Sequence, residues 1–395
     1  MKSKICSLIL VILTLTMAGC GIKQVDYGDE YVFEQDNQTF NVGSKNAVYT
    51  NNGYYVVNSD STMLYFVDTL SNKAKPLCIK PDCKHNQELD GEDCNAYFFA
   101  IHGINYYDNN IYVSAGELNE KNEFVERLYR ISLDGSEREP IVDLYQADNG
   151  DFLEEDNVTN AESFIIHRGM GYLTINWNTQ TQKEIDQTIY KVPLNGDSIE
   201  ELVTYKGINP QITFLYTRGN RIYYGLSTRN NETREWEKRY FYIDILTDKI
   251  SEVLLPDNHV FVSNSDNKNI SMNYNDDGSV SVYQSTGKED MVNLASVDYE
   301  PLVFRDYKYL YFDNSFDMTD KHIVNIMDYK GKINSVVEVD GSLMCSDTRN
   351  ILTYDSETGA YNLYDINTGQ KKEIDTEKIE TEFNPAQEDI RKITN

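Results

Sequence analysis

Three cysteines and a histidine lie close together in the sequence and are the residues best suited to covalent or metal chemistry. Cys78, Cys83 and Cys94 fall within 17 residues, and His85 stands two positions after Cys83. Thiolates and imidazoles are ligands that Zn²⁺ prefers, and closed structural sites use four of them. Cysteines clustered in an oxidising compartment otherwise form disulfides.

We expect one disulfide among these cysteines, because the spacing Cys-x4-Cys-x-His-x8-Cys is not one of the usual zinc patterns. The leftover thiol could then pair with Cys345, far along the chain. A Cys3His metal site and free thiols remain as alternatives. A disulfide or a metal here would be structural and would brace an inter-blade loop, so no cofactor is expected.

Cys20 is a candidate for a different chemistry from that of the clustered cysteines. Lys2 and Lys4 precede a mostly apolar stretch over residues 5–16, which ends in Met-Ala-Gly-Cys at residues 17–20. This pattern is a secretory signal and closely resembles the lipobox of bacterial lipoproteins. The resemblance implies that Cys20 carries fatty acyl chains, such as palmitate, after cleavage. We therefore expect a protein anchored to the cell membrane on its extracytoplasmic face.

Catalytic motifs are missing from the sequence. It contains no Gly-x-Ser-x-Gly, His-Glu-x-x-His, P-loop or Gly-x-Gly-x-x-Gly pattern, and the five histidines are scattered. Carboxylates are so abundant that no pair of them stands out. Trp177 and Trp236 have tyrosine neighbours and could stack against a sugar or peptide, although blade packing or an exposed strand position explains them better. From these patterns we expect no enzymatic activity.

The charge of the chain excludes one class of partner. The 395 residues carry 36 Lys and Arg against 64 Asp and Glu, a net charge of −28. Nucleic-acid binding needs clustered basic residues, so we expect no nucleic-acid partner. Solubility is the simplest explanation of the acidity.

A degenerate repeat organises most of the chain. Residues 128–135 read Leu-Tyr-Arg-Ile-Ser-Leu-Asp-Gly, and residues 189–196 read Ile-Tyr-Lys-Val-Pro-Leu-Asn-Gly. The alternation predicts strands, and the Asx-Gly endings predict tight hairpin turns. Gly287, Gly331 and Gly369 close such units at spacings of 44 and 38 residues. Spacing of this kind, with several strands in each unit, is typical of a β-propeller.

The sequence therefore predicts an all-β fold, a single β-propeller of about seven four-stranded blades, with a pair of β-sandwiches as the alternative. The expected organisation is a signal peptide over 1–19, a lipidated N-terminus and tether over 20–44, the propeller over 45–375 and an acidic C-terminal tail over 376–395. The units run over 46–82, 98–144, 163–205, 212–256, 257–298, 300–340 and 341–375.

Three segments carry a family resemblance. Residues 65–68, Tyr-Phe-Val-Asp, are loosely similar to the Tyr-Trp-Thr-Asp class of propellers. Residues 76–85 read Pro-Leu-Cys-Ile-Lys-Pro-Asp-Cys-Lys-His, and residues 92–98 read Glu-Asp-Cys-Asn-Ala-Tyr-Phe. With the repeat, they make the chain resemble Tyr-rich propeller lipoproteins of Gram-positive anaerobes. This resemblance implies the fold and the location and brings no known activity.

The function expected from the sequence is that of a membrane-anchored binding or interaction module whose protein or glycan ligand is unknown. It would use the loops around the channel mouth, because propellers present variable loops there on a rigid ring. Two alternatives stay open: a secreted hydrolase or lyase acting on carbohydrate or peptide, and a structural component of the cell envelope.

Overall fold

The computed structural model describes residues 25–38, 46–85, 93–119, 124–146, 159–178, 184–230, 232–233, 235–314 and 321–376. The signal peptide, Cys20 and almost all of the expected C-terminal tail lie outside the described residues. Within the described part, no helix has the length and apolar character needed to cross a membrane. The described secondary structure is built of strands, as the alternating Tyr-rich phrases predict.

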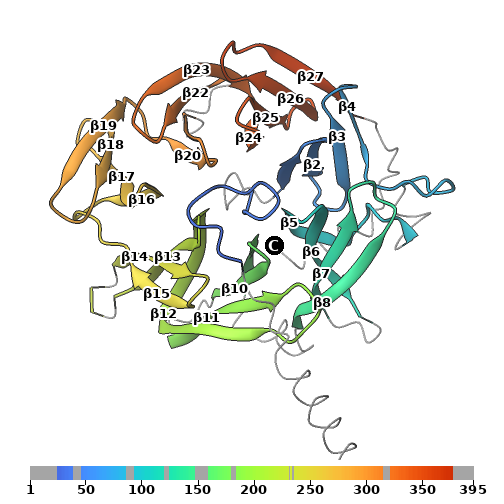
Figure 1. The fold of residues 1–395 in the computed structure, drawn as a ribbon, viewed down its shortest axis with the longest axis horizontal. Helices are drawn as coiled ribbons and strands as arrows, with labels where there is room; N and C mark the ends of the chain where they lie inside the picture. Colours follow the sequence, from blue (N-terminus) through green and yellow to red (C-terminus); the bar gives the residue numbers. More distant parts are fainter. Residues whose placement is uncertain are drawn as a thin grey trace, which may run out of the picture.

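The strands form five sheets arranged as a ring (Figure 1), and neighbouring strands are antiparallel except for β27 and β4. Three sheets have four strands each. The first contains β5 (Ala100–Tyr107), β6 (Asn110–Leu118), β7 (Phe124–Ser132) and β8 (Arg138–Gln146). The second contains β16 (Val260–Ser265), β17 (Lys268–Tyr274), β18 (Val280–Ser285) and β19 (Met291–Val297), and the third contains β20 (Leu302–Arg305), β21 (Tyr309–Asp313), β22 (Lys321–Asp328) and β23 (Ile333–Asp340).

The eight-stranded sheet unites the two ends of the ring. It contains β1 (Ala47–Thr50), β2 (Gly53–Val57), β3 (Leu64–Asp68) and β4 (Lys73–Pro76), with β24 (Ser342–Ser346), β25 (Asn350–Asp355), β26 (Ala360–Asp365) and β27 (Lys371–Thr376). The halves meet where β27 runs parallel to β4, with Asp375 opposite Lys73. This contact pairs the outer strands of the first and last units and protects their edges.

The seven-stranded sheet contains one shared strand. Its members are β9 (Thr159–His167), β10 (Met170–Asn178), β11 (Glu184–Pro193), β12 (Glu200–Arg218), β13 (Arg221–Arg229), β14 (Trp236–Asp244) and β15 (Lys249–Glu252). The first half of β12 pairs with β11 and the second half with β13, so one long strand takes part in two successive units.

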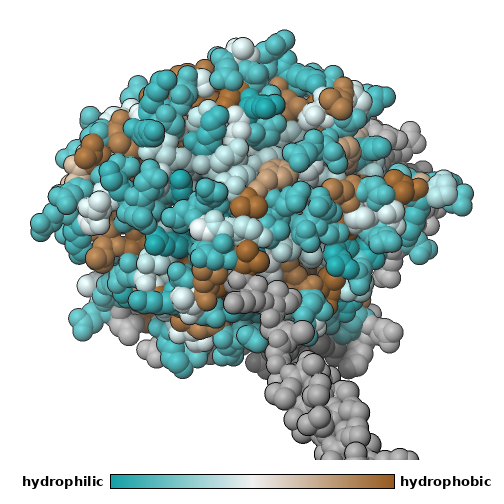
Figure 2. Space-filling view, viewed as in Figure 1, coloured by the Kyte–Doolittle hydropathy of each residue, from teal (hydrophilic) through white to brown (hydrophobic). Residues whose placement is uncertain are grey.

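In the four-stranded sheets the first strand lies nearest the centre of the ring and the last lies at its rim, as β20 and β23 illustrate (Figure 1). The core lies between neighbouring sheets and is rich in tyrosine: Tyr54, Tyr172, Tyr224 and Tyr311 are almost completely buried. Hydrophilic residues cover most of the face seen in Figure 2, with hydrophobic ones in small groups. The fold is therefore β-propeller-like, as the repeat predicts.

Candidate functional site

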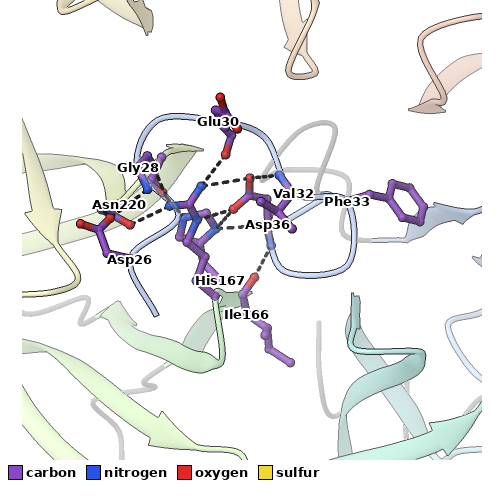
Figure 3. A network of polar contacts seen from close by, with 12 residues as sticks. Asp26, Gly28, Glu30, Val32, Phe33, Asp36, Ile166, His167 and Asn220 are labelled. Carbon is purple, nitrogen blue, oxygen red and sulfur yellow. Dashed lines mark hydrogen bonds and ion pairs between the residues drawn. The ribbon is translucent and has the colours of Figure 1, made fainter. Parts of the chain in front are cut away.

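The middle of the ring holds an N-terminal segment, defined here as residues 25–38, rather than an empty channel (Figure 1). Arg168, in the turn between β9 and β10, holds it in place. Its Nε lies 2.5 Å from Asp36 Oδ1, and both side chains are almost fully buried. The same guanidinium donates to the carbonyl oxygens of Gly28 and Glu30 (Figure 3). The sequence interpretation of residues 20–44 as a tether is thus corrected for this segment, which a buried ion pair fixes to the ring.

His167 supports the same segment through a fixed tautomer. Its Nδ1 accepts the backbone N–H of Asn37 at 3.1 Å, so its Nε2 carries the proton and donates to the carbonyl oxygen of Gly219 at 2.8 Å. Complete burial lowers the pKa of His167 to about 4. The imidazole is therefore neutral at physiological pH.

A cavity of about 210 Å³ lies beside the N-terminal segment, and we call it the channel-mouth pocket. It is smaller than the roughly 300–1,000 Å³ of pockets that enclose drug-sized ligands, which suits a small ligand or the end of a longer one. Its lining combines aromatic, cationic and acidic side chains: Asp29, Tyr31, Asp36, Asn37, Gln38, Tyr49, Tyr216, Thr217, Arg218, Gly219, Arg305, Asp306, Tyr307 and Ser346.

Two arginines of this pocket have no carboxylate partner among the described residues. Arg305 is only 8% exposed, its Nη1 donates to the carbonyl oxygen of Val262, and its Nε has no partner in the described part of the chain. Arg218 lies over the Tyr329 ring at 5.0 Å. Burial lowers the pKa of Arg305, which is the expected response of a cation without a counter-charge. Arg305 and Arg218 are therefore available to pair with an anionic group that enters the pocket.

Asp306 gives the pocket a carboxyl group with unusual surroundings. Its Oδ2 accepts from the Tyr311 hydroxyl at 2.5 Å and from Ser346 at 3.2 Å, and its Oδ1 accepts from the backbone N–H groups of Lys308 and Tyr309. Burial nevertheless raises the pKa of Asp306 to about 6. The group therefore changes its charge within the range in which many enzymes work.

Aromatic rings complete one wall. Tyr31 of the N-terminal segment stacks on Tyr307 with ring centroids 3.9 Å apart, and its hydroxyl lies 3.0 Å from that of Tyr49. Flat rings beside polar groups suit a ligand with apolar faces and polar edges, such as a sugar.

The cysteine segment, defined here as residues 77–85 and 93–96, is the second site. The structure brings Cys78, Cys83, His85 and Cys94 together, with their ligand atoms within 4.8 Å of one another. The disulfide expected from the sequence is not formed in the described residues, where all three thiols and Cys345 are free. Cys345 is a buried free thiol in β24, so the pairing that the sequence suggested is not formed in the described residues.

The three thiols lie in different electrostatic surroundings. Burial raises the pKa of Cys94 to about 12 and also raises that of Cys83. For Cys78, desolvation opposes ionisation, but the backbone N–H groups of Lys80 and Asn95 outweigh it and the pKa is lowered.

The tryptophans do not contribute to the channel-mouth pocket as far as the structure describes them. Trp236 begins β14, is 56% exposed and pairs with Arg229 of β13. Trp177 is part of β10, and its side chain lies outside the described residues. The exposed strand position that the sequence allowed is therefore the one observed for Trp236.

The arginines of the site were missed from the sequence, although a signal exists. Arg218 and Arg305 are the last residues of β12 and β20, and Arg168 directly follows β9, so all three lie where a unit's first strand turns into the second. Because these turns surround the centre of the ring, an arginine recurring at this place indicates a cationic channel mouth.

No model of a known protein family matches the chain, and no curated protein matches it in sequence. Solved structures of similar shape include a computationally designed protein, Ika8, with 13% identity, a TM-score of 0.46 and 89% of each chain covered. The chain is also similar to the GH74 xyloglucanase of Xanthomonas campestris, with 11% identity and a TM-score of 0.42, covering 85% of this chain and 53% of the enzyme. An α-L-arabinanase of Penicillium chrysogenum has 12% identity and a TM-score of 0.37, with 77% and 98% covered.

These neighbours correct one expectation from the sequence. Glycoside hydrolases are among the proteins of similar structure, so the absence of a catalytic motif does not make this chain a non-enzyme. At identities of 11–13% and TM-scores of 0.37–0.46, the activities of these proteins stay their own.

Proposed function

We propose that the channel-mouth pocket binds the acidic group of a saccharide and that the protein is a carbohydrate-active enzyme working at this site. The observation that carries the proposal is Arg305, a buried guanidinium with no carboxylate partner among the described residues. A buried charge without a counter-charge is costly, and a carboxylate of the ligand would compensate it. Arg218 adds a second cation beside it.

The aromatic and acidic residues of the pocket indicate the chemistry of the remaining part of the ligand. Tyr31 and Tyr307 offer a stacking surface for a sugar ring. Asp306, with its raised pKa, is suited to protonate the leaving oxygen, and Asp29 is the second carboxyl group. Cleavage of a glycosidic bond by hydrolysis needs such a pair of carboxyl groups, one acting as acid and one as base or nucleophile.

The overall charge does not oppose this assignment strongly. The chain carries a net charge of −28, which repels an anionic polymer at a distance. At physiological ionic strength, however, that repulsion is screened over about 8 Å, whereas contacts inside a partly buried pocket are screened much less.

Binding is the first test. We expect oligomers of a uronic acid to bind in isothermal titration calorimetry. Neutral oligosaccharides of equal length should bind at least about tenfold more weakly, because they lack the ion pair; this corresponds to about 1.4 kcal/mol of binding free energy. Arg305→Met should abolish the preference, while Arg239→Met, which removes an arginine from a surface ion pair with Glu252, should not. Equal binding of acidic and neutral sugars would refute the proposal.

Turnover is the second test. Release of new reducing ends from acidic oligosaccharides, lost in Asp306→Asn and Asp29→Asn, would identify a hydrolase. Acidic-sugar binding without any cleavage would restore the interaction-module interpretation of the same pocket and overturn the enzymatic part.

We also infer that the ring has seven four-stranded blades. The inference counts β12 twice, as the outer strand of one blade and the inner strand of the next, and divides the eight-stranded sheet at the β27–β4 contact. A crystal structure with six or eight blades would refute this count.

We propose, finally, that Cys20 carries the lipid anchor on the extracytoplasmic face of the cell membrane. The supporting observation is the lipobox-like sequence Met-Ala-Gly-Cys at residues 17–20. Incorporation of a fatty-acid probe by the wild type and its loss in Cys20→Ala would support the anchor, and labelling that persists in Cys20→Ala would exclude it.

A further inference from the structure

The cysteine segment has the composition and the geometry of a metal centre that is independent of the channel-mouth pocket. Three sulfur atoms and one ring nitrogen converge within 4.8 Å, although a stretch between His85 and Cys94 separates two parts of the segment in sequence. We propose that Cys78, Cys83, His85 and Cys94 bind one Zn²⁺ ion in a tetrahedral S3N site.

The measured separation fits such an ion. Zinc lies about 2.3 Å from sulfur and about 2.0–2.1 Å from nitrogen, so tetrahedral ligands place sulfur and nitrogen about 3.6 Å apart. Cys94 Sγ and His85 Nδ1 are 3.7 Å apart. A disulfide, in contrast, would need two sulfur atoms at about 2.05 Å, and none of the cysteines is bonded in this way.

Backbone amides are arranged to support three thiolates. The backbone N–H groups of Lys80, His85 and Ala96 favour the ionised forms of Cys78, Cys83 and Cys94, respectively. In each case the donor is two residues further along the chain. Hydrogen bonds of this kind stabilise the negative sulfur of a metal-bound thiolate and orient it toward the ion.

His85 shows that the backbone is shaped around the same point. It adopts a left-handed conformation with φ of 55°, which is uncommon for a residue other than glycine. This conformation turns the chain directly after Cys83 and brings the ring to Cys94. The set of three sulfurs and one nitrogen selects zinc over calcium or magnesium, which prefer oxygen ligands.

The site would have a structural role, because four protein ligands leave no open position for a substrate. The cysteine segment links β4 to the next unit and contacts it directly: Asn95 Nδ2 donates to the carbonyl oxygen of Gly135 in the β7–β8 turn. Arg138 Nη1 donates to the carbonyl oxygen of Cys94 at 3.1 Å. Zinc would therefore fasten the connection between the first two units of the ring.

The test uses the full chain purified without chelator. Metal analysis should find about one zinc ion per chain, and Cys83→Ala should reduce it to near zero. Cys345→Ala is the matched control, because it removes a buried thiol outside the cluster and should leave zinc unchanged.

Cobalt substitution keeps the proposal testable if a cysteine variant fails to fold. Co²⁺ in the wild-type chain should show thiolate charge-transfer bands and the intense visible absorption of a tetrahedral site. Absence of stoichiometric zinc, or thiol counting that reveals a disulfide between two of these cysteines, would overturn the proposal. Iron or copper bound in place of zinc would equally refute the zinc assignment.

Discussion

Replacing Arg168 with methionine should release the N-terminal segment from the centre of the ring. Methionine keeps much of the apolar stem and removes the guanidinium that binds Asp36 and the carbonyl oxygens of Gly28 and Glu30. Asp36 would then remain as a buried carboxylate without its cation.

The magnitude follows from burial. Both side chains of the Arg168–Asp36 pair are almost fully buried, and removing one partner of such a pair costs about 3–5 kcal/mol. The loss of stability should be near the lower end of this range, because Asp36 regains contact with water when the N-terminal segment detaches from the ring. We therefore expect the free energy of unfolding to fall by about 3 kcal/mol.

Arg239 offers a matched control. It makes two hydrogen bonds to Glu252, at 2.9 and 2.8 Å, but the side chains are 55% and 39% exposed. Exposed pairs of this kind contribute about 0–1 kcal/mol, so Arg239→Met should change stability little.

Urea unfolding followed by circular dichroism measures both variants, and hydrogen exchange of residues 25–38 reports detachment. Adding Asp36→Asn to Arg168→Met should recover part of the loss, because it removes the uncompensated charge. If Arg168→Met and Arg239→Met destabilise the protein equally, or if exchange in residues 25–38 is unchanged, the assignment of Arg168 as the anchor of this segment is wrong.

Three further predictions concern other parts of the molecule. The pKa of His167 is about 4 in the folded state and about 6.5 when unfolded, so the unfolded state takes up the proton first as the pH falls. The free energy of unfolding should therefore fall by up to about 1.4 kcal/mol per pH unit between pH 6.5 and 4. His167→Asn should weaken this pH dependence in urea titrations, and the same pH dependence in wild type and variant would contradict the assignment. Gly135→Ala should lower the melting temperature by more than Gly369→Ala. Both glycines have positive φ, but only a Cβ at 135 would lie 2.5 Å from the Leu77 carbonyl oxygen. Equal changes in melting temperature would exclude this contact as the cause. Trp236→Ala should leave the affinity for acidic saccharides within about twofold, since this exposed ring is not part of the pocket, and a larger loss in calorimetry would place it in the binding site.

Local chemistry made much of the fold predictable. Strands form where the Tyr-rich phrases predict them, as at residues 128–132 and 361–365, and glycines such as Gly135, Gly196 and Gly369 adopt the positive φ that the hairpin turns require. The β12 strand could not be predicted as one element, because its sharing between two units depends on the neighbours on both sides.

For the candidate sites, too, the sequence predicts one part and the tertiary structure decides the other. The types and spacing of Cys78, Cys83, His85 and Cys94 were sufficient to predict a shared site, since residues close in sequence stay close in space. Whether they form a disulfide or a metal-binding cluster depended on the directions of their side chains, which the surrounding loop imposes.

By itself, the sequence determined the all-β class, the repeating unit and the acidic charge, because alternation, turn residues and composition act locally or additively. Only the tertiary structure decided that Arg168 binds Asp36, 132 residues away, and that Arg305, Asp306 and Tyr31 line one pocket. The physical reason is closure of the ring, which brings the same turn of every unit to one centre. There the cost of burying a charge depends on partners that no local pattern specifies.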